Sequence, residues 1–105
     1  MIMSFTVDPL IISEITDLSE RSDVANFTCQ FVGEPVPNIS WYFNGVMINV
    51  SDNSSKYMIM SRSLNITTTE NTLTVYNVTS SDVGVYTCTV TNTHGNDTRH
   101  GKTIS

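Results

Sequence analysis

Apolar and polar residues alternate along this chain in short runs with a period of two residues, which is the period of a β-strand and not of a helix. Between residues 24 and 31 the apolar positions are Ala25, Phe27, Cys29 and Phe31, and one polar residue separates each pair. Gly, Pro, Asn and Ser interrupt the runs, as they do at turns. The pattern predicts an all-β chain of short strands that each bury one face.

The same alternation places the other strands. We expect strands at residues 5–12, 24–31, 38–43, 46–48, 56–61, 72–76, 86–91 and 97–104. Pro9 predicts a break in the first strand, at which the chain either switches between sheets or lies on an edge. Asn44 and Gly45 predict a tight hairpin turn because both residues accept positive φ. The polar residues 62–70 are expected to form a loop, and residues 92–96 the last hairpin.

Four residue types stand at fixed offsets across the chain. Cys29 and Cys88 are separated by fifty-nine positions, Trp41 is the only tryptophan and lies between them, and Tyr86 precedes the second cysteine by two. With these residues the chain resembles an I-set immunoglobulin domain over residues 5–104. The resemblance also rests on Gly33, Pro35 and Pro37 before Trp41, on Asn44-Gly45 after Phe43, on Leu73-Thr74-Val75 before Asp82-Val83-Gly84-Val85-Tyr86-Thr87-Cys88, and on Asn92 with Gly95.

The resemblance implies an immunoglobulin-like β-sandwich of two antiparallel sheets with Greek-key connections. It implies that Trp41 packs against a Cys29–Cys88 disulfide and that the Tyr86 hydroxyl returns to the main chain a few residues upstream. It also implies that Asp82 pairs with a basic side chain, for which Lys56 and Arg62 are the candidates. A disulfide needs an oxidising compartment. The alternative is a pair of buried thiols, as in the immunoglobulin-like domains of intracellular muscle proteins.

The length of 105 residues suits one domain at residues 1–105, with a core at about 5–104. We expect this domain to be excised from a larger multidomain parent that is anchored in a membrane. A disulfide that closes a loop of this length contributes about 4 kcal/mol in the chain-entropy model, so the reduced domain is expected to be marginal.

Composition and motifs argue against several function classes. The net charge of −5 argues against nucleic acid, which requires clustered Lys and Arg. His94 and His100 have no convergent third ligand for zinc, and the spacing of Asp8, Asp17 and Asp23 matches no calcium loop. The carboxylates are scattered and no Gly-x-Ser-x-Gly motif occurs. We therefore predict no catalytic residue, no metal and no cofactor. The five methionines, Met58 and Met60 among them, are expected to fill the core.

Seven of the ten asparagines occur in Asn-x-Ser/Thr with x not proline, the acceptor triplet for N-linked glycans. Ser and Thr account for 28 of the 105 residues, so chance would give about three such triplets. The excess favours the secretory pathway and an extracellular location; the alternative is that a threonine-rich β sequence contains unused triplets. The seven candidates are Asn26, Asn38, Asn49, Asn53, Asn65, Asn77 and Asn96.

The strand assignment places none of these asparagines in the core. Asn26 and Asn38 are expected to face outward and the other five to lie in loops or turns. The outer face that stays bare carries Tyr42, Thr87 and Thr89, and we predict that it binds a protein partner with Tyr42 as the anchor. The alternative is ordinary cross-strand packing of an outward tyrosine.

These observations favour a non-enzymatic extracellular protein-binding module of a cell-surface receptor or adhesion molecule, whose partner is either a second copy or a different protein. This hypothesis rests largely on the fold. A structural spacer in a multidomain ectodomain is the second hypothesis. An intracellular cytoskeletal domain with free thiols is the third, and the excess of glycosylation triplets argues against it.

Overall fold

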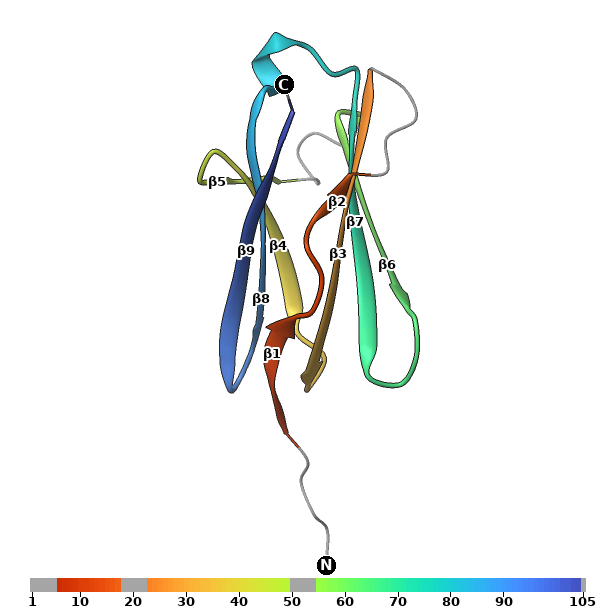
Figure 1. Ribbon diagram of the computed structural model, residues 1–105, viewed down its shortest axis with the longest axis vertical. Coiled ribbons are helices and arrows are strands. Elements are labelled where there is room, and N and C mark those ends of the chain that lie inside the picture. The colour runs from red at the N-terminus through yellow and green to blue at the C-terminus, as the bar shows by residue number, and fades with distance from the viewer. Residues whose placement is uncertain (1–5, 18–22, 50–54, 105) are drawn as a thin grey trace, which may run out of the picture.

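The computed structural model describes residues 6–17, 23–49 and 55–104, which form two antiparallel β-sheets facing each other (Figure 1). The strand order is β1-β3-β7-β6 in the first sheet, where β2 also pairs with β3, and β5-β4-β8-β9 in the second. This architecture confirms the predicted immunoglobulin-like sandwich. The strands are β1 (Val7–Ile11), β2 (Thr16–Asp17), β3 (Val24–Glu34), β4 (Asn38–Phe43), β5 (Val46–Met47), β6 (Tyr57–Ser63), β7 (Thr68–Tyr76), β8 (Gly84–Asn92) and β9 (Gly95–Ile104).

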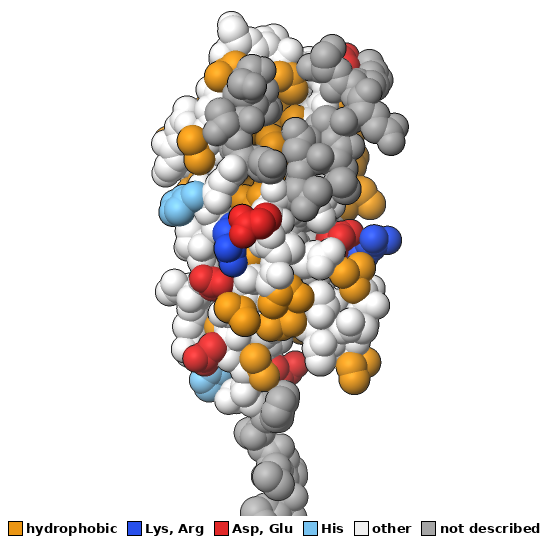
Figure 2. Space-filling view, viewed as in Figure 1, with side chains coloured by type: hydrophobic (Ala, Val, Ile, Leu, Met, Phe, Trp, Pro, Cys, Tyr) orange, Lys and Arg blue, Asp and Glu red, His pale blue; other side chains and the backbone are white. Residues whose placement is uncertain are grey.

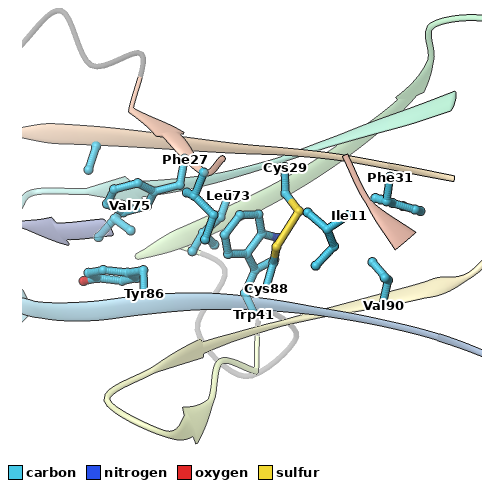
Figure 3. Packing of buried hydrophobic residues seen from close by; sticks show 12 residues of the cluster. Ile11, Phe27, Cys29, Phe31, Trp41, Leu73, Val75, Tyr86, Cys88 and Val90 are labelled. Atoms are coloured by element: carbon cyan, nitrogen blue, oxygen red, sulfur yellow. A yellow bond between two sulfur atoms is a disulfide. The ribbon is translucent and has the colours of Figure 1, made fainter. Parts of the chain in front are cut away.

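The core lies between the sheets and comes mainly from alternate residues of β3, β4, β7 and β8, as the period-two pattern predicts. Figure 3 shows Trp41 beside the disulfide that joins Cys29 of β3 to Cys88 of β8. The rings of Phe27 and Tyr86 stack with their centroids 4.7 Å apart. The buried apolar residues are Ile11, Ile15, Ala25, Phe27, Cys29, Phe31, Trp41, Leu73, Val75, Tyr86, Cys88 and Val90.

Two strands extend into the segment expected to be a loop, so the loop prediction for residues 62–70 is wrong. β6 continues to Ser63 and β7 begins at Thr68. Arg62 pairs in register with Glu70, and Arg62 Nε donates a 2.9 Å hydrogen bond to Glu70 Oε1. Opposite charges thus pair across the hairpin and help to hold the two strands together. The polar residues of this segment indicate a loop when they are considered without their partners.

The prediction that Met58 and Met60 fill the core is also wrong. Tyr57 and Ile59 of β6 face inward, so the intervening residues face out, and Met58 and Met60 are exposed to 43% and 64% of their surface. The pleat decides this orientation, because successive side chains of a strand point to opposite faces.

The ends of the chain differ from the expected strands in detail. The strand expected at residues 5–12 is β1, and a further short strand that was not expected, β2, follows it. Both pair with β3, and the pairing register of β1 shifts between Val7 and Leu10, around Pro9. Pro9 thus lies on an edge strand, which was one of the two expected outcomes, and residue 5 lies outside the described residues. At the last hairpin β9 already begins at Gly95, so Asn96 lies in a strand and not in a loop.

The turn after β4 follows the prediction, since φ is 49° at Asn44 and 83° at Gly45. Two successive positive φ values give the turn a twist that matches the flanking strands. Asn44 Oδ1 also accepts a 2.9 Å hydrogen bond from the Val85 main chain, which fixes the turn against β8. Within the described ranges no helix has the length and apolarity needed to cross a bilayer.

Candidate functional site

The outer face of β4, β8 and β9 is a regular grid of side chains. The pairing register aligns three rows across these strands, because Tyr42 pairs with Thr87 and Ser40 with Thr89, while β9 continues each row. The rows are Asn38-Thr91-Asn96, Ser40-Thr89-Thr98 and Tyr42-Thr87-His100. The three residues predicted to bind a partner, Tyr42, Thr87 and Thr89, therefore share one face.

This face is hollowed into an open depression of about 520 Å³. Thr87 Oγ1 lies 3.0 Å from Nδ1 of His100, and Thr89 Oγ1 lies 3.1 Å from Oγ1 of Thr98. The side chains that line it are Tyr42, Asn44, Val85, Thr87, Thr89, Thr98 and His100, with Gly45. Its chemistry is that of a contact surface: one aromatic ring, small hydroxyls and one imidazole.

His100 and Thr98 belong to the depression, although the sequence analysis did not assign them to a site. The sequence did contain a signal for His100, namely its distance from the turn of the last hairpin. Asn92 pairs with Gly95 beside the turn, and five residues further along each strand Thr87 pairs with His100. Gly101 falls at a register shift in β9, so that His100 pairs with Thr87 whereas Lys102 pairs with Tyr86. The alternation alone does not reveal this bulge.

Six of the seven glycosylation candidates lie in the described part of the chain, and Asn53 lies outside it. Asn38, Asn49, Asn65, Asn77 and Asn96 are exposed and Asn26 is half-buried. At Asn38, Asn65, Asn77 and Asn96 the Nδ2 atom, which carries the sugar in an N-linked glycan, donates no hydrogen bond to the described residues. Asn26 Oδ1 accepts a 2.6 Å hydrogen bond from Thr74 Oγ1.

The asparagines outside the acceptor triplets have structural roles. Asn71 Nδ2 donates to Ser61 Oγ, and Asn92 Nδ2 donates to the carbonyl oxygens of Val7 and Pro35, both at 3.0 Å. Asn44 has positive φ and accepts the bond from Val85 described above. The amide nitrogens of Asn71 and Asn92 are thus committed to the fold, whereas those of four triplet asparagines are not.

A buried polar contact lies at the centre of the core. Trp41 Nε1 donates a 2.7 Å hydrogen bond to Asn71 Oδ1, and each residue is about 1% exposed. The carboxamide therefore satisfies the indole N–H that the sandwich encloses. Asn71 was not among the predicted site residues; its signal in the sequence is a polar residue two positions before the inward Leu73 of β7.

Asp82 joins the start of β8 to the other sheet. Lys56 Nζ lies 2.7 Å from Asp82 Oδ2, and the Thr79 main-chain N–H donates to the same oxygen at 2.9 Å. Burial acts to raise the pKa of Asp82, but the hydrogen bonds from Lys56 and Thr79 and the Lys56 charge outweigh it and lower the pKa. Of the two basic candidates it is Lys56 that pairs with Asp82, while Arg62 pairs with Glu70.

The Tyr86 hydroxyl donates a 2.8 Å hydrogen bond to the Asp82 carbonyl oxygen, which is the return to the main chain that the resemblance implies. Burial and the nearby Asp82 charge raise the pKa of Tyr86, so the hydroxyl stays protonated and keeps its proton for this bond.

The described residues contain no cluster of three or more His, Cys, Asp or Glu side chains suited to a metal ion. His94 and His100 are both exposed. On the face shown in Figure 2 the basic side chains are scattered and form no continuous patch among the described residues.

Two sheets that enclose a tryptophan beside an inter-sheet disulfide define an immunoglobulin-like sandwich. The family model described as the immunoglobulin I-set domain matches residues 13–102, and the chain belongs to this family. The family is non-catalytic, which confirms the prediction that the domain is no enzyme. Its members are protein-binding or structural modules.

The chain is similar to domains from both sides of the plasma membrane. It is 34% identical over 88 residues to titin of Drosophila melanogaster, covering 83% of this chain and 0%, after rounding, of titin. It is 34% identical over 91 residues to neuroglian of the same species, covering 87% of the chain and 6% of neuroglian. Human hemicentin-1 is 34% identical over 71 residues, covering 68% of the chain and 1% of hemicentin-1. The chain thus spans 6% or less of the length of these curated relatives.

Solved structures agree on the fold. Titin domain M7 superposes with a TM-score of 0.76 at 26% identity, covering 93% of each chain. The titin tandem A164–A165 superposes with a TM-score of 0.69 at 35% identity, covering 93% of this chain and 46% of the tandem.

Proposed function

We propose that this domain is an extracellular, N-glycosylated protein-binding module of a cell-surface receptor or adhesion protein. The observation that carries the proposal is the division among the asparagines. Four exposed asparagines within acceptor triplets leave Nδ2 without a hydrogen bond to the described chain, whereas two of the three asparagines outside the triplets, Asn71 and Asn92, use Nδ2 to hold the fold. The third, Asn44, contributes through Oδ1. A glycan on the first group disturbs no contact of the sandwich.

Glycans at two of these positions would border the candidate binding face. Asn38 and Asn96 stand in the same row on either side of Thr91, at one end of the grid. The Tyr42-Thr87-His100 row lies two rows away, and none of its residues is a glycan acceptor. Sugars would therefore direct a partner toward the depression at Tyr42, where an aromatic ring provides contact area at low entropic cost.

The similarity to titin supports the alternative location inside the cell, whereas neuroglian and hemicentin-1 support the one outside. The excess of acceptor triplets and their placement on the surface favour the second group. An extracellular location also suits the Cys29–Cys88 disulfide, because secreted proteins keep such bonds oxidised.

The test is the mass of the domain secreted from a eukaryotic cell, with each peptide measured after enzymatic removal of N-glycans in heavy-oxygen water. Occupied asparagines become labelled aspartates. We expect labels at Asn38, Asn65, Asn77 and Asn96, with Asn71 and Asn92 unlabelled as internal controls. A secreted domain without any labelled asparagine would refute the proposal.

A second candidate function is a spacer between neighbouring domains. β1 begins at one end of the sandwich and β9 ends at the other, so the chain enters and leaves at opposite ends (Figure 1). A spacer predicts that no substitution on the Tyr42 face changes binding by the parent protein.

A further inference from the structure

A groove opens on the side of the sandwich, between the first half of β4 and strand β6. Its volume is about 540 Å³. Apolar side chains from both sheets line it, namely Phe31 of β3, Ile39 of β4 and Ile59 of β6. Val36, which is 65% exposed, and Asn38 also contribute to the lining.

The strand order explains why the groove is open. β6 is the last strand of its sheet, and β5 pairs only with Tyr42 and Phe43 at the far end of β4. The β4 residues from Asn38 to Ser40 therefore have β8 on one side and no described strand on the other, whereas the Trp41 carbonyl already accepts a 2.9 Å hydrogen bond from the Ile48 main chain. Among the described residues, no further strand pairs with the free edge of β6 or with this part of β4.

Asn71 also lines the groove, so the groove leads to the buried Trp41–Asn71 hydrogen bond. Ser61, whose Oγ accepts from Asn71 Nδ2, is another lining residue. Asn71 is about 1% exposed, so water reaches its carboxamide only when the lining of the groove moves apart, and the hydrogen bond is stronger while solvent is excluded. A cover over the groove would therefore protect the contact at the centre of the core.

Asn38 lies on the exposed edge of β4, so it belongs both to the outer row with Thr91 and Asn96 and to the lining of the groove. It stands in an acceptor triplet, and its Nδ2 donates no hydrogen bond to the described residues. We propose that the first N-acetylglucosamine of a glycan on Asn38 lies in this groove and covers the route to Trp41 and Asn71. The inference rests on the proposed function, since it requires a glycosylated domain.

The chemistry of the groove fits this sugar. A pyranose ring has an apolar C–H face and its N-acetyl group has a methyl, which pack on Val36, Ile39 and Ile59. Its hydroxyls can form hydrogen bonds with Ser61 and Ser63, which are exposed lining residues. The volume lies within the range of about 300–1,000 Å³ that small-molecule sites occupy.

The linkage itself is a glycosyl transfer. A bond forms between Asn38 Nδ2 and C1 of the sugar, and the bond between C1 and the phosphate oxygen of a lipid-diphosphate-linked oligosaccharide breaks. One amide proton and the lipid diphosphate leave. Glycosylation of Asn38 breaks no hydrogen bond within the described residues, because its Nδ2 donates none to them.

The experiment uses the secreted glycoprotein and reads the hydrogen exchange of the Trp41 indole N–H, which is unambiguous because the chain has one tryptophan. Three forms are compared: intact, trimmed by an endoglycosidase that leaves one N-acetylglucosamine, and fully deglycosylated. The inference predicts equal exchange in the first two forms and several-fold faster exchange in the third. Equal exchange in all three forms would overturn it.

Matched variants separate the Asn38 sugar from the others. Asn38→Gln and Ser40→Ala each remove this acceptor triplet, and Ser40→Ala keeps the asparagine itself. Asn96→Gln is the control, since Asn96 is exposed and lies in the same row of the same sheet. Only the first two variants should speed the indole exchange in the glycoprotein, and neither should change it in sugar-free protein made in bacteria. An equal effect of Asn96→Gln would contradict the inference.

Site occupancy distinguishes the two possible failures. If Asn38 carries no sugar while Asn65, Asn77 or Asn96 does, the groove inference is wrong and the proposed function stands. If no asparagine carries a sugar, both are wrong.

Discussion

The main-chain N–H of Ile11 donates a 2.8 Å hydrogen bond to Oδ2 of Asp97, although the two residues belong to different sheets. Arg99 Nη2 donates to the Ile11 carbonyl oxygen at 3.1 Å, so side chains of β9 bind both polar groups of this residue. They take the place of the ladder bonds that a neighbouring strand would make. β1 therefore forms its strand pairing with β3 of the first sheet and is linked to the second sheet by these side-chain hydrogen bonds from β9.

This contact predicts that Asp97→Ala destabilises the domain by about 1–3 kcal/mol, because it leaves the N–H of the buried Ile11 without its acceptor. Chemical denaturation measures the loss, and the Ile11 amide should exchange faster in the variant. Asp97→Asn retains a carbonyl acceptor and should recover most of the stability. If Asp97→Ala unfolds at the wild-type denaturant concentration, the contact does not hold the strand.

Asn71 predicts a larger loss. Asn71→Ala removes the acceptor of the Trp41 indole and leaves a small cavity, and we expect a cost of about 2–4 kcal/mol. Asn96→Ala makes the same substitution at an exposed position of β9 and should cost less than about 0.5 kcal/mol. Both are measured by urea unfolding of sugar-free protein with Trp41 fluorescence as the signal. Equal unfolding midpoints for the two variants would show that the buried hydrogen bond contributes nothing.

The Lys56–Asp82 pair predicts the acid dependence of stability. The folded-state pKa of Asp82 lies below its ordinary value of 3.8, so the unfolded chain binds this proton more readily. The contribution is therefore fully present above the unfolded pKa and is lost as the pH falls through the lower folded pKa. Urea unfolding between pH 6 and pH 2 should show a steeper acid loss in the wild type than in Lys56→Met. Parallel curves for the two proteins would contradict this assignment.

Partner binding tests the role of Tyr42. Tyr42→Ala should weaken binding by about 2 kcal/mol or more, or about thirtyfold in Kd, if the ring is the anchor of the interface. Tyr76→Ala removes the same side chain from a strand of the opposite sheet and serves as the control. The readouts are the clustering of domain-coated beads, for binding to a second copy, and the staining of cells by a multimerised domain, for binding to another protein. Unchanged binding by Tyr42→Ala would favour the spacer.

The sequence predicts the frame of the domain well, because the frame depends on local rules. Alternation gives the inward residues of β3, β4, β7 and β8, and the fixed offsets of Cys29, Trp41 and Cys88 give the sandwich. Charged and polar positions are different. Arg62 and Glu70 look like a loop until they are seen to pair across a hairpin, and Asn71 looks like a surface residue until the indole of Trp41 lies against it. Such roles depend on which strands become neighbours, and short-range pattern does not specify that.

In the candidate binding face, too, some residues are predicted by local alternation and others depend on how the strands pair. The alternation correctly places Tyr42, Thr87 and Thr89 on one outer face. Alternation does not reveal His100, but counting outward from the last hairpin turn does, because the pairing is regular from Asn92–Gly95 to Thr87–His100 and shifts only beyond it, at Gly101. That these residues bind a partner stays a prediction, as does the extent of the domain within a longer parent.

The most direct test is made on the native protein in its own cells. Extracts are treated with the amidase that removes N-glycans and are compared with untreated extracts by electrophoresis, using an antibody to this domain on a fragment released by limited proteolysis. An extracellular glycosylated domain predicts that the fragment loses several kilodaltons on treatment. A fragment that migrates identically before and after treatment would contradict the proposed location and, with it, the function assigned to the Tyr42 face.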